Sequence, residues 1–559
     1  MDRTLLAECL QIPEEKIQVI AQDVGGGFGI NSHLYPEQIL TCFLSIRTGR
    51  PVKWIEDRRE HVCGAIHSGD CIQYVTLFAK KDGTILGMRD RMIQNVGAYL
   101  QTRHIVSTFV TAILVPGPYR IPAYSAEIEA VFTNKGPVGT YRAFGMTQAT
   151  FARERMMDLL AKRLGMDPLE VRMKNLIGSD EFPYANPAGL VYDSGKYGAT
   201  VAKAIELSGY NKFEKDAKSS GTKRRGIGLG FFLEIGGVGN LDTLPTKGRK
   251  YVPKETAKIA LHNDGSFTVY SGVAPTGQGL ETTLAKIVAD EFQVEPSRVS
   301  VVHGDTNSCP YSADGTIASR SANLAGNAVL LASRELKQRL SDFAASAFGV
   351  GSRNNHPEYA EDAFRTDSGT LSLERLANDF YAKNPGAVLE QVSSYEPAIK
   401  SGTSAFGVHV ALVEVDGETG FVSLKKIVMV HDCGNILNPV VVEGMAHGGI
   451  AQGISAALLE QVVYGEQGEI LGSSLGDYLI PTSLDMPPIS TGHTVTPSPT
   501  NPLGVKGGGE GGIIGVPAAI ASAIDDALGL GQEFHNDRIS RMPFDPQSLL
   551  RFAPQVASK

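Results

Sequence analysis

Six glycine-rich segments, spread over more than 480 residues, constrain this 559-residue chain more than any other feature. Its 62 glycines exceed the usual share of roughly 7%, and they gather in clusters without a fixed repeat. Glycine lets a backbone approach a ligand closely, and exposed N–H groups bind anions. Six such loops predict one large anionic ligand held from many sides. The segments are DVGGGFGIN (23–31), GTYRAFGMTQATF (139–151), PTGQGLETT (275–283), DGTIASRSANLAGNAV (314–329), GMAHGGIAQG (444–453) and VKGGGEGGIIG (505–515).

The last segment places one carboxylate, Glu510, between glycines on both sides. The residues that follow have a helical pattern, so the loop opens a helix whose positive end favours anions. Glycines explain backbone freedom, but they do not explain an acid in their middle. The pattern of glycines alone leaves the role of Glu510 open.

Helix and strand patterns alternate along the whole chain, which predicts a mixed α+β fold class. A chain of this length should hold two or more domains. We expect a first domain over residues 1–212 and a second over residues 213–559, with the polar stretch 211–226 as the linker. The loop-rich stretch 348–365 is expected to be a surface excursion.

Local signals place several elements. One helix is expected to end near Gly165, and the next begins at Pro168 with Asp167 as its N-cap residue. A further helix is expected over 320–349, closed by a glycine. An Asn-Asp-Gly turn at 263–265 joins two alternating stretches and predicts a β-hairpin.

An internal similarity relates residues 10–27 to residues 292–306. Each copy has a large apolar residue, a glutamine, a β-branched residue, a turn that carries proline and an alternating strand. Two interpretations stay open, a true duplication or two helix–turn–strand units of a common kind. The strand of the first copy needs neighbours in a sheet, and little sequence precedes it to supply them. We therefore expect a partner segment there.

Charge and composition exclude several classes of protein. A net charge of −8 disfavours a nucleic-acid or acidic-membrane partner. No apolar run reaches the roughly 20 residues that span a bilayer, and the first residues lack a signal-peptide pattern. The six cysteines are scattered without a C-x-x-C pair, so we expect neither a zinc site nor an iron–sulfur cluster within this chain. A cytoplasmic protein is expected.

Two phosphate-binding motifs are also excluded. GGGFG lacks the spacing of the dinucleotide-binding fingerprint, and no acidic residue ends a second strand where a ribose would need it. A phosphate loop with Lys-Ser or Lys-Thr is absent.

Taken together, the motifs resemble the molybdenum-binding large subunit of the xanthine oxidase family of molybdenum hydroxylases. The resemblance implies a molybdenum-dependent oxidoreductase with the family's two-domain fold and the cofactor between the domains. The motifs occur in the family's order from residue 5 to about residue 530. They are DVGGGFG with YPEQ, TYRAFG, GQGLETT, TIASRSANLAGNAV, CGNILNPVVVEGMAHGGIAQG and NPLGVKGGGEGGIIGVPAAIASAIDDALG.

The resemblance assigns roles motif by motif. Glu510 falls on the family's catalytic glutamate, and Phe144, Arg142 and Leu229 fall on positions that face substrate. Phe144 has two interpretations, stacking on a planar substrate or packing beside the cofactor. No protein side chain is expected to bind molybdenum directly, because the pterin dithiolene holds it. The expected cofactor-binding residues are Gly27, Phe28, Gly29, Arg142, Ala143, Gln278, Ala318, Ser319, Arg320, Ser321, Gly508 and Gly509.

The family's reaction inserts a water-derived oxygen into an electron-poor C–H bond. The metal makes its oxygen ligand more acidic, and a carboxylate within hydrogen-bond reach completes the deprotonation. Glu510 must then be largely ionised, although desolvation raises the pKa of a carboxyl group. The N–H groups of the flanking glycines, and Lys506, are candidates to compensate for that desolvation.

Three departures from the family pattern bear on the substrate. Ala143 stands where the branch that oxidises carbon monoxide carries cysteine, and Ser32 stands where purine-hydroxylating members carry glutamate. Copper–molybdenum chemistry and xanthine are therefore disfavoured. Met445 replaces a glutamine of many relatives, which puts one cofactor contact in doubt. An N-heteroaromatic substrate is expected; the alternatives are an aldehyde oxidoreductase, the reductive direction, and an inactive structural paralogue.

Cofactor and partner expectations follow from the same resemblance. The usual bacterial form is molybdopterin cytosine dinucleotide. The [2Fe-2S] clusters and FAD are expected on separate small and medium subunits, in an obligate hetero-oligomer. Family large subunits carry a sizeable portion before DVGGGFG, so a separate chain is expected to supply it unless the chain is truncated.

Overall fold

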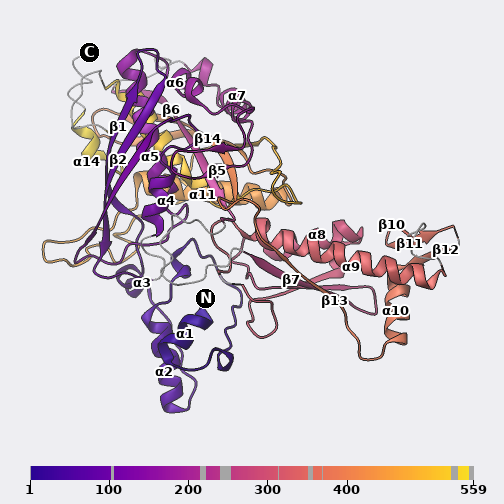
Figure 1. The fold of residues 1–559 in the computed structure, drawn as a ribbon. Coiled ribbons are helices and arrows are strands. Elements are labelled where there is room, and N and C mark those ends of the chain that lie inside the picture. Colours follow the sequence, from indigo (N-terminus) through magenta and orange to yellow (C-terminus); the bar gives the residue numbers. More distant parts are fainter. Residues whose placement is uncertain are drawn as a thin grey trace.

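The structure is a computed structural model that describes residues 2–101, 106–213, 222–238, 254–312, 314–349, 357–367, 369–530 and 539–552. Figure 1 shows two lobes, one with most of the chain and one that extends to the right with helices α8, α9 and α10. Both lobes contain helices and strands, so the predicted mixed class is confirmed.

The helices have the following bounds: α1 Asp2–Leu10, α2 Pro36–Thr48, α3 Arg58–Gly64, α4 Val106–Leu114, α5 Met146–Leu164, α6 Pro168–Asn175, α7 Tyr197–Ser208, α8 Leu280–Phe292, α9 Gly326–Ala347, α10 Leu373–Lys383, α11 Pro439–Leu458, α12 Gly511–Ile514, α13 Val516–Leu528 and α14 Pro546–Leu550. The strands have the following bounds: β1 Asp70–Ala79, β2 Ile85–Gly97, β3 Tyr124–Phe132, β4 Tyr184–Ala185, β5 Val191–Tyr192, β6 Lys223–Gly236, β7 Glu255–Leu261, β8 Phe267–Ser271, β9 Val299–His303, β10 Glu358–Ala360, β11 Ala363–Thr366, β12 Gly369–Ser372, β13 Leu389–Tyr395, β14 Thr403–Asp416, β15 Val422–Asp432 and β16 Ile489–His493.

A four-stranded sheet with the order β16-β15-β14-β6 forms the centre of the larger lobe. Strands β6 and β14 pair antiparallel along their full lengths and are buried at most residues. Helix α13 packs on both strands. The stretch Gly511–Leu528 is the one described helical stretch apolar and long enough to cross a membrane, and 94% of it is buried inside the protein.

Three glycines on β6 let α13 approach the strand at backbone contact distance. Gly226, Gly228 and Gly230 alternate along the strand, so they share one face. A Cβ atom on Gly228 would lie 2.2 Å from the carbonyl oxygen of Ala519 and 2.2 Å from the nitrogen of Ala523. Those atoms belong to the helix backbone and cannot rotate away.

We expect Gly228→Ala to lower the free energy of unfolding by about 3 kcal/mol, the upper end for overpacking, because backbone must shift to admit the methyl group. The measurement is the urea midpoint of the full chain, followed by circular dichroism. Gly198→Ala is the control, because Gly198 is exposed in α7 with no atom within 4 Å of an added Cβ. That change should be neutral or stabilising by up to about 1 kcal/mol. Equal midpoints for the two variants would contradict the packing argument.

The second lobe is built on the sheet β13-β7-β8-β9, against which α8 and α9 pack. Strands β7 and β8 pair antiparallel around the turn at 263–265, as the sequence predicted. Helix α9 is preceded by a π-helical turn over Ser321–Ala325, so the predicted helix begins irregularly. The predicted cap at Asp167 is confirmed, since its side chain accepts the N–H groups of Leu169 and Glu170.

The two lobes have separate hydrophobic cores. One core draws on residues between 85 and 235 and between 406 and 549, and the other draws on residues 257–395. Residues on both sides of the expected boundary at 212/213 share the first core, so that boundary does not coincide with the division between cores. Residues 214–221 of the expected linker lie outside the described residues, and Lys223 already begins β6. In the expected surface excursion, 350–356 lie outside the described residues, and β10 and β11 follow.

The internal similarity has a structural counterpart. Helix α1 ends at Leu10 and α8 at Phe292, and the next residue in each copy, Gln11 or Gln293, has a positive φ of 53° or 49°. A 3-10 turn and extended backbone follow in both copies, at Glu14–Lys16 and Ile17, and at Pro296–Arg298 and Val299. Corresponding landmarks lie 282 residues apart throughout. The agreement favours a duplication over two unrelated units.

The two copies differ in their sheet neighbours. In the second copy, β9 pairs in parallel with β8 along its whole length. In the first copy, the corresponding stretch 17–21 forms no strand, and its described pairing is a single bridge from Ile20 to Asp305. The first copy therefore lacks the counterpart of β8 among the described residues.

Candidate active site

Glu510 lies where the last glycine-rich segment turns into helix α12, as the N-cap residue of that helix. One carboxylate oxygen, Oε1, accepts the backbone N–H of Ala143 at 2.9 Å. The other oxygen, Oε2, lies 3.3 Å from the hydroxyl of Ser319. Ala143 and Ser319 belong to two other glycine-rich segments, 367 and 191 residues away in sequence. Three of the six segments therefore meet at this carboxylate.

Arg142 links a further segment to this point. Its guanidinium donates to the carbonyl oxygens of Gly509 and Met445 and to the side-chain oxygen of Gln452, at 2.5–3.0 Å. Met445 and Gln452 lie on α11, within the segment 444–453. Most of the guanidinium donors are therefore taken by protein, and Arg142 fastens the loop before Glu510 to α11.

The GGGFG loop lies against the same region. A Cβ atom on Gly29 would lie 2.6 Å from the carbonyl oxygen of Thr140, so only glycine allows this approach. A Cβ on Gly27 would lie 3.8 Å from the side chain of Thr276, in the segment 275–283. The Arg142 guanidinium stands 5.8 Å from the ring of Phe28. All six segments are thus connected, as predicted for loops around one ligand.

Backbone strain is concentrated in these loops. Nine described residues other than glycine have positive φ. Five of the nine lie in the glycine-rich segments: Phe28, Ala143, Phe144, Ala318 and Ser319. Such conformations cost about 1–3 kcal/mol each and persist where the surroundings impose them, often at ligand sites.

A second carboxylate, Glu234, lies beside Glu510 and was missed by sequence reasoning. It lies two residues before the end of β6 and is fully buried. Its Oε1 accepts the Ser319 hydroxyl at 2.5 Å and the backbone N–H of Glu510 at 3.1 Å. The signal in the sequence was an acid within the otherwise uncharged stretch GIGLGFFLEIGG.

Burial and the neighbouring carboxylate raise the pKa of Glu510 to about 7. Desolvation is the largest cause, and the charge of Glu234 is the next. The Ala143 N–H, the Arg142 guanidinium and the Ser319 hydroxyl act in the opposite direction. Burial also raises the pKa of Glu234.

The flanking glycines and Lys506 were expected to offset the desolvation of the Glu510 carboxylate, and the structure assigns this task to other groups. The backbone N–H of Glu510 is directed to Glu234, and Ala143 supplies the backbone N–H to the Glu510 carboxylate. Lys506 donates to the carbonyl oxygen of Ser194 at 2.8 Å. The cation that lowers the pKa of Glu510 is Arg142. Lys506 therefore anchors the glycine-rich segment 505–515 to Ser194.

The loops also present buried donors that suit an anionic cofactor. Within the described residues, Gln278 Nε2 and Arg320 Nε are buried without a hydrogen-bond partner. Arg320 forms ion pairs with Glu255 at 2.9 Å and Asp314 at 3.0 Å. Buried donors are normally satisfied, so a group rich in acceptor atoms, such as a pterin with a pyrophosphate tail, fits these positions.

Other predicted site residues lie at different distances from Glu510. Ala318, Ser321, Gly508 and Gly509 are in the same or adjoining loops. Phe144 is partly buried against the core of the larger lobe, and its N–H donates to Tyr141. Leu229 is fully buried in that core. It precedes Glu234 by five residues on β6, which is about 16 Å, so the structure does not bring Leu229 to Glu510.

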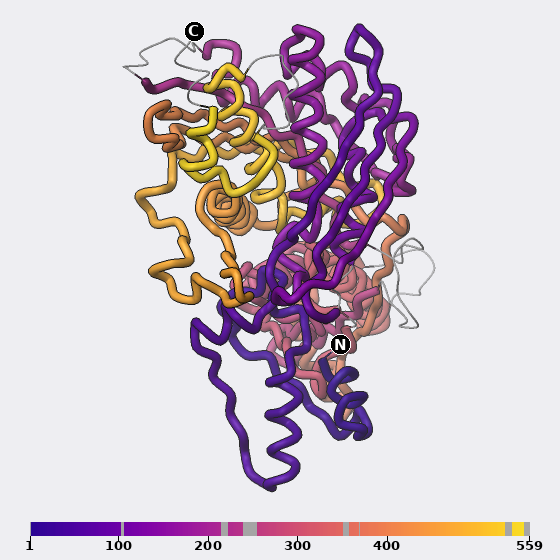
Figure 2. The backbone as a smooth tube through the Cα atoms, turned by 90° about the vertical axis from the view of Figure 1, so that its left-hand side faces the viewer, coloured from indigo at the N-terminus to yellow at the C-terminus, as the bar shows by residue number. Residues whose placement is uncertain are grey.

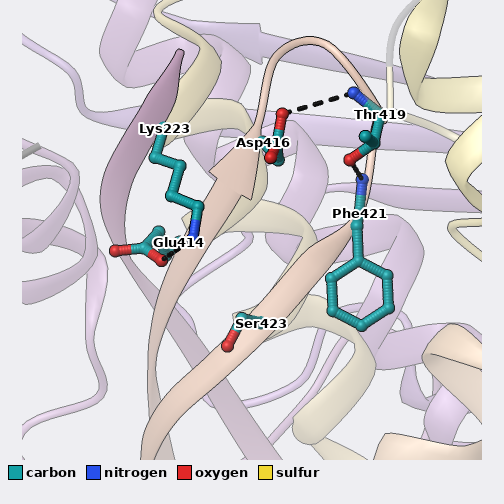
Figure 3. A pocket seen from close by; sticks show the side chains of 6 residues that line it. All are labelled: Lys223, Glu414, Asp416, Thr419, Phe421 and Ser423. Atoms are coloured by element: carbon teal, nitrogen blue, oxygen red, sulfur yellow. Dashed lines mark hydrogen bonds and ion pairs between the residues drawn. The ribbon is translucent and has the colours of Figure 1, made fainter. Parts of the chain in front are cut away.

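A surface hollow of about 390 Å³ lies elsewhere, at the opposite end of the central sheet (Figure 3). It is lined by Lys223, Glu414, Asp416, Thr419, Phe421 and Ser423. Lys223 begins β6 and Glu234 lies near the other end of that strand, about 35 Å away for an extended strand. This hollow is therefore separate from the Glu510 cluster.

Comparison with known proteins agrees with this arrangement. Two family models, both described as molybdopterin cofactor-binding domains, match residues 1–176 and 203–487. The large chain of carbon monoxide dehydrogenase from Hydrogenophaga pseudoflava is 34% identical over 94% of this chain and 66% of its own length. The chain belongs to the xanthine oxidase family of molybdenum hydroxylases. Its place is among the family's molybdenum-binding large subunits, which confirms the resemblance drawn from the motifs.

Two further family members are similarly close. The large subunit of nicotine 6-hydroxylase from Paenarthrobacter nicotinovorans is 35% identical over 93% of this chain and 64% of its own length. The structure of quinoline 2-oxidoreductase from Pseudomonas putida 86 superposes with a TM-score of 0.91 at 34% identity. That match covers 99% of this chain and 71% of the other. The chain spans about two thirds of the length of the curated relatives.

Proposed function

We propose that this chain is the catalytic large subunit of a molybdenum hydroxylase that inserts water-derived oxygen at an electron-poor C–H carbon of an N-heteroaromatic substrate. The observation that carries the proposal is the Glu510 carboxylate, held by the Ala143 N–H where the glycine-rich loops meet. Relatives named for quinoline and nicotine support a nitrogen heterocycle. Two electrons pass on to iron–sulfur and FAD centres on partner subunits.

The site residues have defined tasks in this reaction. The molybdenum cofactor, when bound, would supply two-electron redox chemistry and would make a water-derived oxygen more acidic. Gln278, Ser321, Arg320 and the loop around Gly508 are placed to hold the pterin and its tail. Glu510 accepts a proton on its carboxylate, and a pKa of about 7 suits a general base at neutral pH. The Ala143 N–H fixes the carboxylate orientation.

The competing functions differ in testable features. An aldehyde oxidoreductase would use the same base and cofactor, so the substrate alone distinguishes it. The reductive direction would need electrons delivered to the site from the partner subunits. The presence of Glu510 together with Ser319 and Ser321 argues against an inactive structural paralogue. Ala143 and Ser32 argue against carbon monoxide and xanthine as substrates. The Ser32 hydroxyl donates to the carbonyl oxygen of Gly29 in its own loop.

We also propose that the cofactor is molybdopterin cytosine dinucleotide and that the assembly is a cytoplasmic hetero-oligomer. A further partner segment is proposed to complete the first copy of the duplicated unit, as β8 completes the second. In support, Leu40, Phe43 and Leu44 are exposed on α2, which buries no residue and projects from the body in Figure 2. In the second lobe, by contrast, helices α8 and α9 pack on the sheet β13-β7-β8-β9.

The proposed reaction is tested on the assembled enzyme, with an artificial electron acceptor and a matched panel of quinoline, nicotine, benzaldehyde, xanthine and carbon monoxide. We expect hydroxylation of a nitrogen heterocycle, with ¹⁸O from labelled water in the product. Turnover of benzaldehyde alone would favour the aldehyde oxidoreductase. Absence of molybdenum from the purified assembly would favour the structural paralogue.

A further inference from the structure

Glu234 and Glu510 form a pair of carboxylates joined by one hydroxyl group. Ser319 Oγ lies 2.5 Å from Glu234 Oε1 and 3.3 Å from Glu510 Oε2. The hydroxyl also accepts the backbone N–H of Gly509 at 3.1 Å. Because the hydroxyl has one hydrogen, it donates to one carboxylate at a time. The two carboxylate oxygens lie within about 6 Å of each other, a range in which like charges oppose joint ionisation.

The backbone strengthens the link between the two acids. The N–H of Glu510 donates to Glu234 Oε1, and the N–H of Gly511 also faces the Glu234 carboxylate. Glu234 therefore binds the first N–H groups of α12, which otherwise lack partners at a helix start. A Cβ on Gly511 would lie 2.9 Å from Glu234 Oε2, so the helix start has little room to shift. The position of Glu510 is thus set by Glu234.

The pair has few charged neighbours. From the loop at 139–145, Arg142 acts on both carboxylates. Cys433 lies beneath Gly508 with a protonated thiol, because burial raises its pKa to about 12. Lys506 is held by Ser194, and His409 of β14 is buried and neutral. Arg320 is paired with Asp314 of its own loop and with Glu255 of β7. Arg142 is therefore the cation that faces the pair among the described residues, and it cannot neutralise two carboxylates.

We propose that Glu234 is a positioning residue for Glu510, and that the two carboxylates share one proton through the hydroxyl of Ser319. Glu234 stays buried, acts through Glu510, and need not touch substrate. This inference rests on the proposed function for its consequence in turnover, but the sharing of the proton is a property of the chain itself. The net effect is that the negative charge of Glu234 makes Glu510 a stronger base than it would be alone.

The direction of the pH effect follows from the charges. When Glu510 takes up a proton, repulsion from Glu234 is relieved, so Glu234 favours the protonated form of Glu510. Glu234→Gln removes that charge, and Glu510 should then lose its proton at lower pH. Ser319→Ala keeps both charges but removes the hydroxyl donor that the two carboxylates share. Release of the proton should then need higher pH. The two variants are expected to act with opposite sign.

The test is a pH titration of the carboxyl C=O stretch by infrared difference spectroscopy on the purified full chain. The band of Glu510 is the one that Glu510→Gln removes. We expect the midpoint of that band to fall by about one pH unit, a tenfold change in proton affinity, in Glu234→Gln. We expect it to rise in Ser319→Ala. A merely structural role for Glu234 predicts no shift, so an unchanged or raised midpoint in folded Glu234→Gln would overturn the proposal.

The same variants separate this inference from the proposed function. In the assembled enzyme, the acid limb of kcat/KM should move with the infrared midpoint in both variants. If Glu510→Gln keeps full turnover while the infrared midpoints shift as expected, the proposed function fails and the shared proton stands. If turnover is lost in Glu510→Gln but neither midpoint moves, the shared proton fails and the proposed function stands. Should Glu234→Gln not fold, Ser319→Ala carries the test, and an unchanged midpoint there would overturn the proposal.

Discussion

Replacement of Glu510 by glutamine should lower kcat/KM by about 100-fold to 10,000-fold, the range for loss of a positioned general base. Glutamine keeps an oxygen that can accept the Ala143 N–H, but it cannot take up a proton. The cofactor should be retained, because the loops at Gln278 and Arg320 are unchanged. The measurement combines steady-state kinetics with the molybdenum content of the assembled enzyme.

The pH profile gives a second check on the same residue. The pKa of Glu510 is raised to about 7, so the base form is lost as the pH falls below about 7. We expect kcat/KM to decline tenfold per pH unit on the acid side. Glu414→Gln is the control, since Glu414 is a half-buried acid paired with Lys223 and Lys425 at the far end of the sheet. Near-normal turnover in Glu510→Gln would refute the assignment of Glu510 as the base.

The motifs predicted which loops meet, but they did not predict how the meeting point is built. Glycines signal positions of close approach, and for Gly29 and Gly511 the approach is to protein atoms of another loop or strand. Glu234 has no motif of its own, because a single acid in an apolar strand looks like many surface or buried acids. Glu234 comes next to Glu510 because β6 lies beside the start of α12 in the folded chain.

Leu229 illustrates the opposite limit. Its position in GIGLGFFLE suggested a wall facing substrate, yet the side chain is buried in the core of the larger lobe. The internal similarity extends to local backbone geometry, which its two short segments did not reveal. Gln11 and Gln293 occupy left-handed conformations at matching places, which a residue pattern alone does not reveal. A local residue pattern also does not show which strand pairs with the repeated segment, as β8 pairs with β9.

A buried ion network holds α5 against α6, α13 and β6, and Glu154 is its most connected acid. Glu154 is fully buried and accepts from Arg153 Nε at 3.1 Å, Arg172 Nε at 2.8 Å and the Tyr119 hydroxyl at 3.0 Å. It also accepts the backbone N–H of Phe231 on β6 at 3.2 Å. Arg153 and Arg172 are themselves fully buried. The network therefore balances two buried cations beneath the strand that carries Glu234.

Glu154→Gln should lower the free energy of unfolding by about 3–5 kcal/mol, because it leaves the buried Arg153 guanidinium without its carboxylate partner. That loss is a large part of the roughly 5–15 kcal/mol typical of a folded domain. The measurement is the urea midpoint of the larger lobe, with molybdenum content as a second readout, since a loosened β6 releases the Glu234 end of the site. Glu129→Gln, which breaks the exposed pair with Arg91, is the control and should cost less than about 1 kcal/mol. If the two variants unfold at the same urea concentration, the buried network is not what fastens β6 to α5.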